Sequence, residues 1–478
     1  MSFAHIIYLQ QPSTMKIIKT LLATTLLLSA CNMEEDEYIY PENLPSLSDR
    51  TYAGGGTTIF NETSFAYGFP APGLTPEEDD MHGDGDSMFE QTFVRNPAPN
   101  FGGLGPIFNS SSCFDCHPGD GRAAFPADDM VRARGFFMRV SLPGEDEHGG
   151  PLPVPGFGTQ VQNRALFGYQ PEGRFGVTYQ DIVETFKDGT QVVLKKPIYT
   201  LTGVTATVPA NILISPRTSM PIYGLGLLEF IPEADLLAAE DIEDKNKDGI
   251  SGKVNRVWDE ANQRMGIGRF GWKANTATLL DEAAGSYLGD LGVTNPYHGY
   301  RVELGHGQVD SDDGIDDEPE MTKKQVDDTA FYLQTLAVPA ARNMNKASVR
   351  NGSRIFEGIG CAKCHTPKQH TLQAPISALA NQTFYPYTDM LLHDMGEDLA
   401  DGRPDFLANG REWRTRPLWG IGLQELVSGH THFMHDGRAK NITEAILWHG
   451  GEALRSKEIF KKLTKKERAD LLEFLNSI

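Results

Sequence analysis

The sequence is poor in cysteine, in long apolar runs and in basic charge, and each shortage excludes a class of protein. Five cysteines among 478 residues are too few for a fold held together by disulfides. A mean hydropathy of −0.35 excludes a protein with several membrane spans. Because 64 acidic residues outnumber 43 Lys and Arg, the net charge of −21 repels phosphate backbones, and nucleic acid is not an expected partner.

One apolar run lies near the start, where a stretch with two lysines and a ten-residue apolar segment (residues 16–30) precedes Cys31. The apolar segment has half of the roughly 20 residues that a membrane span needs, so it predicts a signal peptide. The tetrapeptide that ends at Cys31 is similar to the lipobox of bacterial lipoproteins, which predicts acylation of this cysteine. An ordinary secretory cleavage after Ala30 is the alternative.

The predicted signal peptide covers residues 1–31, with Met15 as the expected true start, and residues 32–58 form an acidic, solvated tether. This organisation predicts a protein of the cell envelope that meets the membrane through its lipid anchor, at the outer membrane.

The other four cysteines form two copies of the motif Cys-x-x-Cys-His. Two thiols at this spacing can bond to both vinyl groups of one haem, and the following imidazole then reaches the iron. A zinc site would have to join pairs 248 residues apart and leave both histidines unexplained, while a redox dithiol needs no histidine. The motifs predict two haem c cofactors, bound covalently by Cys113, Cys116, Cys361 and Cys364, with His117 and His365 as proximal iron ligands.

A second regularity is an internal repeat. The sequence PIYGLGLLE at residues 221–229 recurs as PLWGIGLQE at residues 417–425. Capping-box patterns at Thr322 and Thr464 then open amphipathic helical runs. The order haem motif, Pro/Gly turn and closing helix is therefore traversed twice, with about 50 extra residues in each interval of the first copy.

This duplication predicts a mainly α fold of two cytochrome c-like helical domains. The expected N-terminal domain spans residues 59–340 and the C-terminal domain residues 341–478. Long loops and short strands, such as one over residues 191–202, are expected to fill the insertions of the first domain.

The sixth coordination position decides whether a haem carries electrons or reacts. Asn441 and Glu444 form a helix-start pattern, and His449 follows on the apolar face of that helix, which predicts His449 as the distal ligand of the C-terminal haem. A hydrogen-bonded core histidine is the alternative. The same interval counted from Pro221 reaches Lys253 in a loop, so the N-terminal iron is expected to be open or weakly ligated. Candidates that would close it are Met138, His148, His298 and His306.

Several segments together resemble the di-haem oxidoreductase family, also labelled thiol oxidoreductases, which is related to bacterial di-haem cytochrome c peroxidases. These segments are GPIFN before Cys113, the turn at 221–229, GRFGWK at 268–273, LLHDMG at 391–396, MHDGR at 434–438 and WHG at 448–450. The resemblance implies that electrons enter at the C-terminal haem, from a donor protein or a small redox carrier, and that peroxide or another oxidant reacts at the N-terminal haem. It also assigns the distal role to His449, with His in place of Met. Because every cysteine is committed to haem or lipid, a dithiol mechanism is not expected.

The stretch that carries the catalytic glutamate of the peroxidases is not legible in this chain, and Glu229 is a candidate acid, with a structural carboxylate as the alternative. Trp272 is a candidate relay between the haems, with ordinary packing as the alternative. Three arginines are candidates for haem propionates, with exposed loop positions as the alternative: Arg217, Arg414 and Arg438.

A loop rich in Asp, Asn and Gly matches the first half of a calcium-binding loop, with Asp244, Asn246, Asp248 and the carbonyl of Ile250 as candidate ligands. The twelfth position is Asn255 instead of the usual Glu, so a turn held by its own side-chain hydrogen bonds is an equal alternative.

Taken together, the sequence predicts an exported, lipid-anchored, peroxidase-like di-haem c oxidoreductase. Two other functions stay open at this point. One is an electron-transfer cytochrome without a substrate of its own, and the other is a surface lipoprotein that assists iron or haem acquisition.

Overall fold

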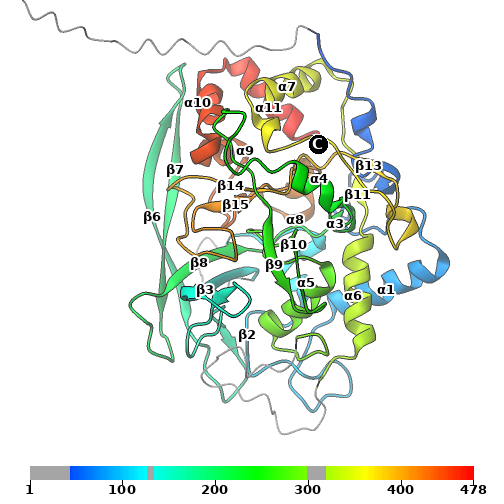
Figure 1. The fold of residues 1–478 in the computed structure, drawn as a ribbon, viewed down its shortest axis with the longest axis vertical. Coiled ribbons are helices and arrows are strands. Elements are labelled where there is room, and N and C mark those ends of the chain that lie inside the picture. The colour runs from blue at the N-terminus through cyan, green and yellow to red at the C-terminus, as the bar shows by residue number, and fades with distance from the viewer. Residues whose placement is uncertain (1–42, 126–133, 299–318) are drawn as a thin grey trace, which may run out of the picture. The chain divides into compact units, whose positions relative to one another are not determined.

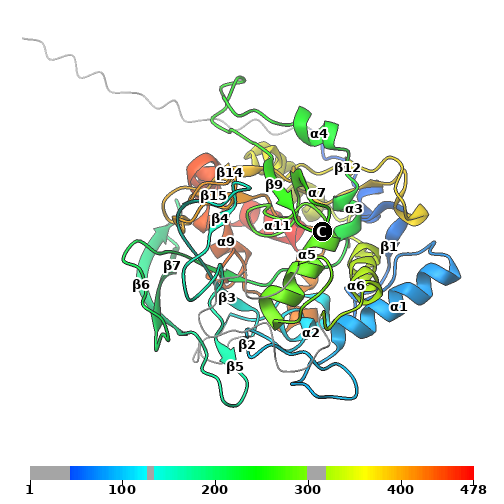
Figure 2. The same ribbon diagram turned by 60° about the horizontal axis from the view of Figure 1, so that its bottom comes forward.

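Two pairs of crossing helices make up the helical framework of the computed structural model (Figures 1 and 2). Helix α1 (Pro76–Glu90) packs against α6 (Lys323–Thr335), and α7 (Ala347–Gly358) packs against α11 (Lys465–Leu475). Both closing helices, α6 and α11, begin at the predicted capping boxes, in which a threonine and a Gln or Glu satisfy each other's backbone groups. The structure describes residues 43–125, 134–298 and 319–478.

A glycine lies at the crossing point of each helix pair. A Cβ atom at Gly85 would lie 2.1 Å from the Asp328 carbonyl oxygen, and one at Gly352 would lie 2.0 Å from that of Asp470. Asp328 and Asp470 occupy the same position, six residues after the capping threonine of their helix. The two repeats of the sequence are therefore built around the same close helix crossing.

Shorter helices complete the framework and carry much of the functional site. They are α2 (Cys113–Cys116), α3 (Leu225–Glu229), α4 (Glu233–Ala238), α5 (Leu279–Ser286), α8 (Gln424–Ser428), α9 (Ile442–Trp448) and α10 (Leu454–Lys462). A π-helix, η5 (Tyr287–Leu291), continues α5. None of the helices in the described ranges is long and apolar enough to cross a membrane.

The strands form small sheets, most of them antiparallel pairs. In the first repeat they are β1 (Thr58–Ile59), β2 (Ile107–Phe108), β3 (Phe136–Glu145), β4 (Pro151–Leu152), β5 (Arg164–Ala165), β6 (Arg174–Thr185), β7 (Gln191–Thr202), β8 (Leu213–Thr218), β9 (Asn255–Asp259), β10 (Arg264–Gly268) and β11 (Val338–Pro339). In the second repeat they are β12 (Gln369–His370), β13 (Thr383–Phe384), β14 (Leu392–Asp394) and β15 (Glu412–Arg414).

The structure is 30% helix and 21% strand, so the prediction of a mainly α fold is wrong. The insertions of the first repeat are the reason. Strand β3 lies between β4 and β8, and β6 and β7 pair along their whole length as a long hairpin (Figure 1). Alternating β-branched and aromatic side chains, with the turn Asp188-Gly189, favour such a hairpin over a loop. The strand expected over residues 191–202 is confirmed as β7.

Residues 43–58 lie in the segment whose composition predicts a solvated tether, but here they pack against the second repeat. Leu47 is 1% exposed, and Arg50 pairs with Glu357 at 3.2 Å. Strand β1 pairs in parallel with β11, so the start of the described chain is fixed between the repeats. The signal peptide, Met15, Cys31 and His306 lie outside the described residues.

A buried group of charges ties the insertions of the first repeat to a loop of the second. Arg217, on β8, pairs with Asp405, and Arg403 pairs with the same carboxylate at 2.6 Å. Lys273 donates to Asp401 at 2.8 Å, and both of these side chains are fully buried. Because buried charges are stable only when paired, these contacts fix the loop around Asp405 against β8.

Candidate functional site

Each Cys-x-x-Cys-His motif lines its own cavity. The N-terminal cavity, of 110 Å³, is lined by the first motif, and the C-terminal cavity, of 230 Å³, by the second. In both motifs the histidine backbone N–H donates to the carbonyl of the first cysteine, at 3.0 Å for His117 and 2.9 Å for His365. This helical turn brings both thiols and the imidazole to one cavity.

Three histidines that line the cavities, His117, His365 and His449, all have Nε2 as the ring nitrogen that can bind a metal. Each donates its Nδ1 proton to a backbone carbonyl, so each Nε2 keeps its lone pair. Burial lowers the pKa of His117 and of His365 to about 4, and it also lowers the pKa of His449, so all three rings are neutral. The Nδ1 contacts are His117 to Met220 at 2.6 Å, His365 to Tyr387 at 3.0 Å and His449 to Ala445 at 2.7 Å. A neutral imidazole oriented through Nδ1 is the usual form of an iron ligand.

Helices α5 and α9 hold equivalent places at the two cavities. Each begins at a side-chain cap, with Thr278 accepting from the Asp281 backbone N–H at 3.3 Å and Asn441 accepting from that of Glu444 at 2.9 Å. The fourth, fifth and eighth residues after each cap line the cavity: Glu282, Ala283 and Ser286 in one, and Ala445, Ile446 and His449 in the other. Ser286 thus stands where the C-terminal cavity has His449.

The N-terminal cavity also holds two carboxylates. Glu282 lies on α5, and Asp290 follows two turns later because η5 continues the helix past Ser286. Burial raises the pKa of both carboxyl groups, while Gln160 donates to Asp290 at 2.6 Å. The C-terminal cavity has an alanine at the position of Glu282, so only the N-terminal cavity carries an acid on this helix.

Three arginines line the cavities, and none of them forms a salt bridge within the described residues: Arg122, Arg414 and Arg416. Arg122 is 3% exposed, and its Nε has no hydrogen-bond partner. Burial lowers the pKa of Arg122 and of Arg414 to about 9 and that of Arg416 to about 10. Buried guanidinium groups without a carboxylate fit the propionates that two haems would bring.

The other two arginines predicted for propionates are already paired with carboxylates. Arg217 pairs with Asp405, and Arg438 pairs with Asp436 at 2.7 Å. Neither lines a cavity, so of the three predicted arginines the structure brings only Arg414 to the site.

One wall separates the two cavities, because six residues line both of them. Two are aromatic, Tyr223 and Trp419, and they hold the same position in the two repeats of the Pro/Gly turn. Tyr223 Oη donates to the Trp419 carbonyl oxygen at 2.5 Å, and the Tyr67 ring stacks on Tyr223 at 4.1 Å. The four other shared residues are Pro221, Arg414, Arg416 and Pro417.

Trp272, the predicted relay, lines the C-terminal cavity but not the N-terminal one. Its Nε1 donates to the Thr218 carbonyl at 2.7 Å, and guanidinium groups of Arg122 and Arg416 lie over its ring at 5.5 and 4.9 Å. Cations over the ring disfavour loss of an electron from it. Tyr223 and Trp419 are better placed between the cavities.

Glu229, the predicted acid, lines neither cavity. One carboxylate oxygen accepts from the Leu279 backbone N–H at 2.8 Å and the other from Gln334 at 2.7 Å. Both oxygens therefore hold the first turn of α5 against α6.

The described candidates for closing the N-terminal iron also lie away from the N-terminal cavity. Met138, on β3, is fully buried in a hydrophobic core cluster. His148 stacks on Trp258, with ring centroids 4.0 Å apart, and His298 contacts Asp281 at 2.8 Å.

The calcium-like loop directs its oxygens to its own backbone. Asp244 accepts from the N–H groups of Asp248 and Gly249, at 2.9 and 3.1 Å, and Asn246 also accepts from Asp248 at 2.9 Å. Asp248 accepts from Ile250 N–H at 3.1 Å and pairs with Lys363 at 2.9 Å. These contacts match the alternative of a self-bonded turn, and the Lys363 pair links this turn to the second haem motif.

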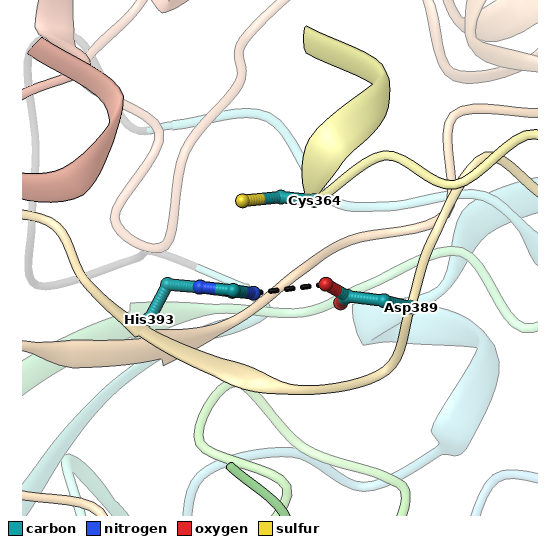
Figure 3. A group of neighbouring side chains, drawn as sticks. All are labelled: Cys364, Asp389 and His393. Atoms are coloured by element: carbon teal, nitrogen blue, oxygen red, sulfur yellow. Dashed lines mark hydrogen bonds and ion pairs between the residues drawn. The ribbon is translucent and has the colours of Figure 1, made fainter. Parts of the chain in front are cut away.

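Cys364, Asp389 and His393 form a group whose donor atoms all lie within 4.8 Å of one another (Figure 3). The His393 ring points toward Asp389, at 2.9 Å from Nε2, and its Nδ1 lies 2.7 Å from Glu452. Carboxylates only accept, so both ring nitrogens carry protons and neither has a lone pair for a metal. Burial alone would lower the pKa of His393, but hydrogen bonds to Asp389, Cys364 and Glu452 raise it to about 12.

Sequence reasoning missed Glu282, Ser286 and Asp290, although their signal is present. They are spaced four residues apart behind Thr278 and Asp281, a helix start of the same kind as Asn441 and Glu444. Counting from Pro221 misleads because 57 residues separate it from Thr278, whereas 24 separate Pro417 from Asn441. The extra residues form the calcium-like loop and the β9–β10 hairpin.

Two cavities, each lined by a Cys-x-x-Cys-His motif and separated by one shared wall, are the arrangement expected of a redox protein with two centres. Comparison with family models agrees: residues 47–478 match the model described as "Di-haem oxidoreductase, putative peroxidase". The chain belongs to this di-haem oxidoreductase family.

No curated protein matches the chain. Among solved structures it is similar to a chain of hydrazine synthase from Kuenenia stuttgartiensis, at 19% identity and a TM-score of 0.22. The match covers 33% of this chain and 55% of the other, so this chain spans about half the length of that relative.

Proposed function

We propose that this oxidoreductase is an exported, lipid-anchored peroxidase with two covalently bound haems, in which electrons enter at the C-terminal cavity and are used at the N-terminal cavity. The observation that carries the proposal is a difference at equivalent positions of the two cavities, where His449 directly follows α9 but Ser286 and Glu282 lie on α5. The anchor rests on the sequence before Cys31.

A haem held in each cavity would supply one-electron redox chemistry at its iron. His117 and His365 are the proposed proximal ligands, and His449 the proposed distal ligand in the C-terminal cavity. The fixed Nδ1 contacts hold the ring orientation and leave the lone pair of each neutral ring on Nε2. The unpaired guanidinium groups of Arg122, Arg414 and Arg416 would neutralise propionates.

Glu282 is the proposed acid of the N-terminal cavity. Its raised pKa keeps the carboxyl group protonated at a pH where an ordinary glutamate ionises, so it can give a proton to the leaving oxygen of a peroxide. Ser286 has a hydroxyl in place of an imidazole and leaves room for a small substrate. Asp290 is a second carboxyl group through which the proton can be replaced.

Tyr223 and Trp419 form the proposed electron path between the cavities, because they are the aromatic residues that line both. No described lysine or arginine stacks on the Trp419 ring, unlike the ring of Trp272. An indole without a stacked cation gives up an electron more readily.

The test is rapid mixing of the half-reduced protein with hydrogen peroxide. We expect one oxidation phase at each haem and consumption of about one peroxide per two electrons, from the stoichiometry of peroxide reduction to water. His449→Ala should convert the C-terminal haem from low spin to high spin. A protein inert to peroxide, with two low-spin haems, would instead be an electron carrier.

A further inference from the structure

His393 lies on the short strand β14, which pairs with β15 and places His393 opposite Trp413. The residue is 3% exposed and lines the C-terminal cavity. Asp389 and Glu452 take one ring nitrogen each, at 2.9 and 2.7 Å. A buried cation between two carboxylates is held rigidly, because moving either partner leaves a buried charge without compensation.

Asp389 belongs to the loop that orients His365. Its backbone N–H donates to the Cys364 carbonyl at 3.0 Å. Two residues earlier, the Tyr387 carbonyl receives the Nδ1 proton of His365 at 3.0 Å. The two hydrogen bonds of His393, to Asp389 and to Glu452, form a bridge. The Asp389 side of this bridge is therefore fixed to His365 and Cys364.

Glu452 belongs to the turn that follows His449. This turn, η10 (Gly451–Ala453), packs directly on β14, since a Cβ atom at Gly451 would lie 2.2 Å from the Asp394 carbonyl oxygen. The second oxygen of Glu452 accepts from Ser251 Oγ at 2.7 Å. The Glu452 side of the bridge is thus fixed at a residue that lies three positions after His449 in the chain.

We propose that His393 is a positioning residue. It links the loop that orients His365 to the turn that follows His449, at the edge of the C-terminal cavity, and so keeps both imidazoles within reach of one iron. Among the described residues, the His393 side chain hydrogen-bonds to Asp389 and Glu452 and not to the Tyr387 or Ala445 carbonyls, so it acts through the two carboxylates. The inference rests on the proposed pairing of His365 and His449.

The test replaces His393 by Gln in the full, haem-loaded protein. Glutamine cannot present two N–H groups in opposite directions, so the bridge to one carboxylate is lost. We expect a high-spin signal at the C-terminal iron in the ferric state. Cyanide should bind there roughly tenfold more tightly or better, the usual size of effect when a residue that orients a metal ligand is changed. Added imidazole should restore the low-spin spectrum.

Glu452→Gln provides a second variant that keeps the shape of the side chain and its bond with Ser251. It should shift the spin state in the same direction by less. The matched control is His370→Gln, because His370 also faces a carboxylate, Asp235 at 3.3 Å, but half-exposed and away from the cavity lining. The control should keep the original spectrum and cyanide affinity.

An unchanged low-spin spectrum with cyanide affinity within twofold in both His393→Gln and Glu452→Gln would overturn the positioning role. His449→Ala separates this failure from failure of the proposed function. If His449→Ala gives a high-spin iron and His393→Gln does not, only the bridge is wrong. If neither variant changes the spectrum, His449 is not the distal ligand.

Discussion

The two cavities differ more at helices α5 and α9 than in their Cys-x-x-Cys-His motifs. Both motifs have a cysteine pair and a histidine whose Nδ1 donates to a backbone carbonyl. By contrast, the eighth residue after the helix cap is His449 in the C-terminal cavity and Ser286 in the N-terminal one. The proposed function assigns the difference between an electron-carrying centre and a reactive one to two positions, where Glu282 and Ser286 stand in place of Ala445 and His449.

The largest expected effect comes from removing one pair of cysteines. Replacing Cys361 and Cys364 by Ala should remove one covalent haem of two, and replacing Cys113 and Cys116 should remove the other, because each motif lines a separate cavity. Intact mass after denaturation measures this directly. A protein that still carries two haems after either change would refute the assignment of one haem to each motif.

Exchanging the distal residues should exchange the two behaviours. Ser286→His should bring an imidazole to the N-terminal iron, turn it low-spin and abolish reaction with peroxide, while His449→Ser should open the C-terminal iron. Electronic absorption and magnetic resonance of the ferric variants report the spin state of each haem. Ser286→Thr, which adds no ligand, is the control and should remain reactive.

Glu282→Gln should lower kcat/KM for peroxide by about 10²- to 10⁴-fold, the usual contribution of a positioned acid. The spectrum of the C-terminal haem should not change. In the unchanged protein, activity should persist above the pH at which an ordinary glutamate ionises and fall as the pH rises through the raised pKa, because the protonated form is the active one. A variant with less than tenfold loss would remove Glu282 as the acid.

Glu229→Gln should have the smallest effect. Its oxygens accept from Leu279 N–H and from Gln334, so the change weakens the anchoring of α5 by about 1 kcal/mol. Urea unfolding measures the change in the free energy of unfolding. Because Glu229 lines neither cavity, kcat/KM should fall by less than for Glu282→Gln, and the opposite order would restore Glu229 as the acid.

The features that the sequence predicted correctly are those that depend on a few neighbouring residues. The capping boxes before α6 and α11 and the cap before α9 are confirmed, since a few neighbouring residues satisfy the first backbone groups of a helix. The haem motifs are also local, and each of them lines a cavity. The sequence alone therefore predicted the two motifs that line the cavities and the helix that ends just before His449.

The predictions that were wrong, or that missed a residue, concern features that depend on contacts between distant parts of the chain. The mainly α prediction underestimated the insertions, whose strands find partners far along the chain, as β3 does with β8. The roles of Arg217 and Arg414 were indistinguishable in the sequence, because only the fold brings Asp405 to Arg217 and leaves Arg414 at the cavities without a salt bridge to any described carboxylate. The sequence analysis missed Ser286 because an insertion lengthened the segment between Pro221 and the helix cap. The number of residues between the cap and Ser286 did not change.

The most direct measurement is the spin state of the two irons in the ferric, haem-loaded protein at low temperature. The account predicts equal amounts of one low-spin centre with two nitrogen ligands and one high-spin centre, and only the high-spin centre should bind added cyanide rapidly. Two low-spin centres of equal intensity, both indifferent to cyanide, would contradict it.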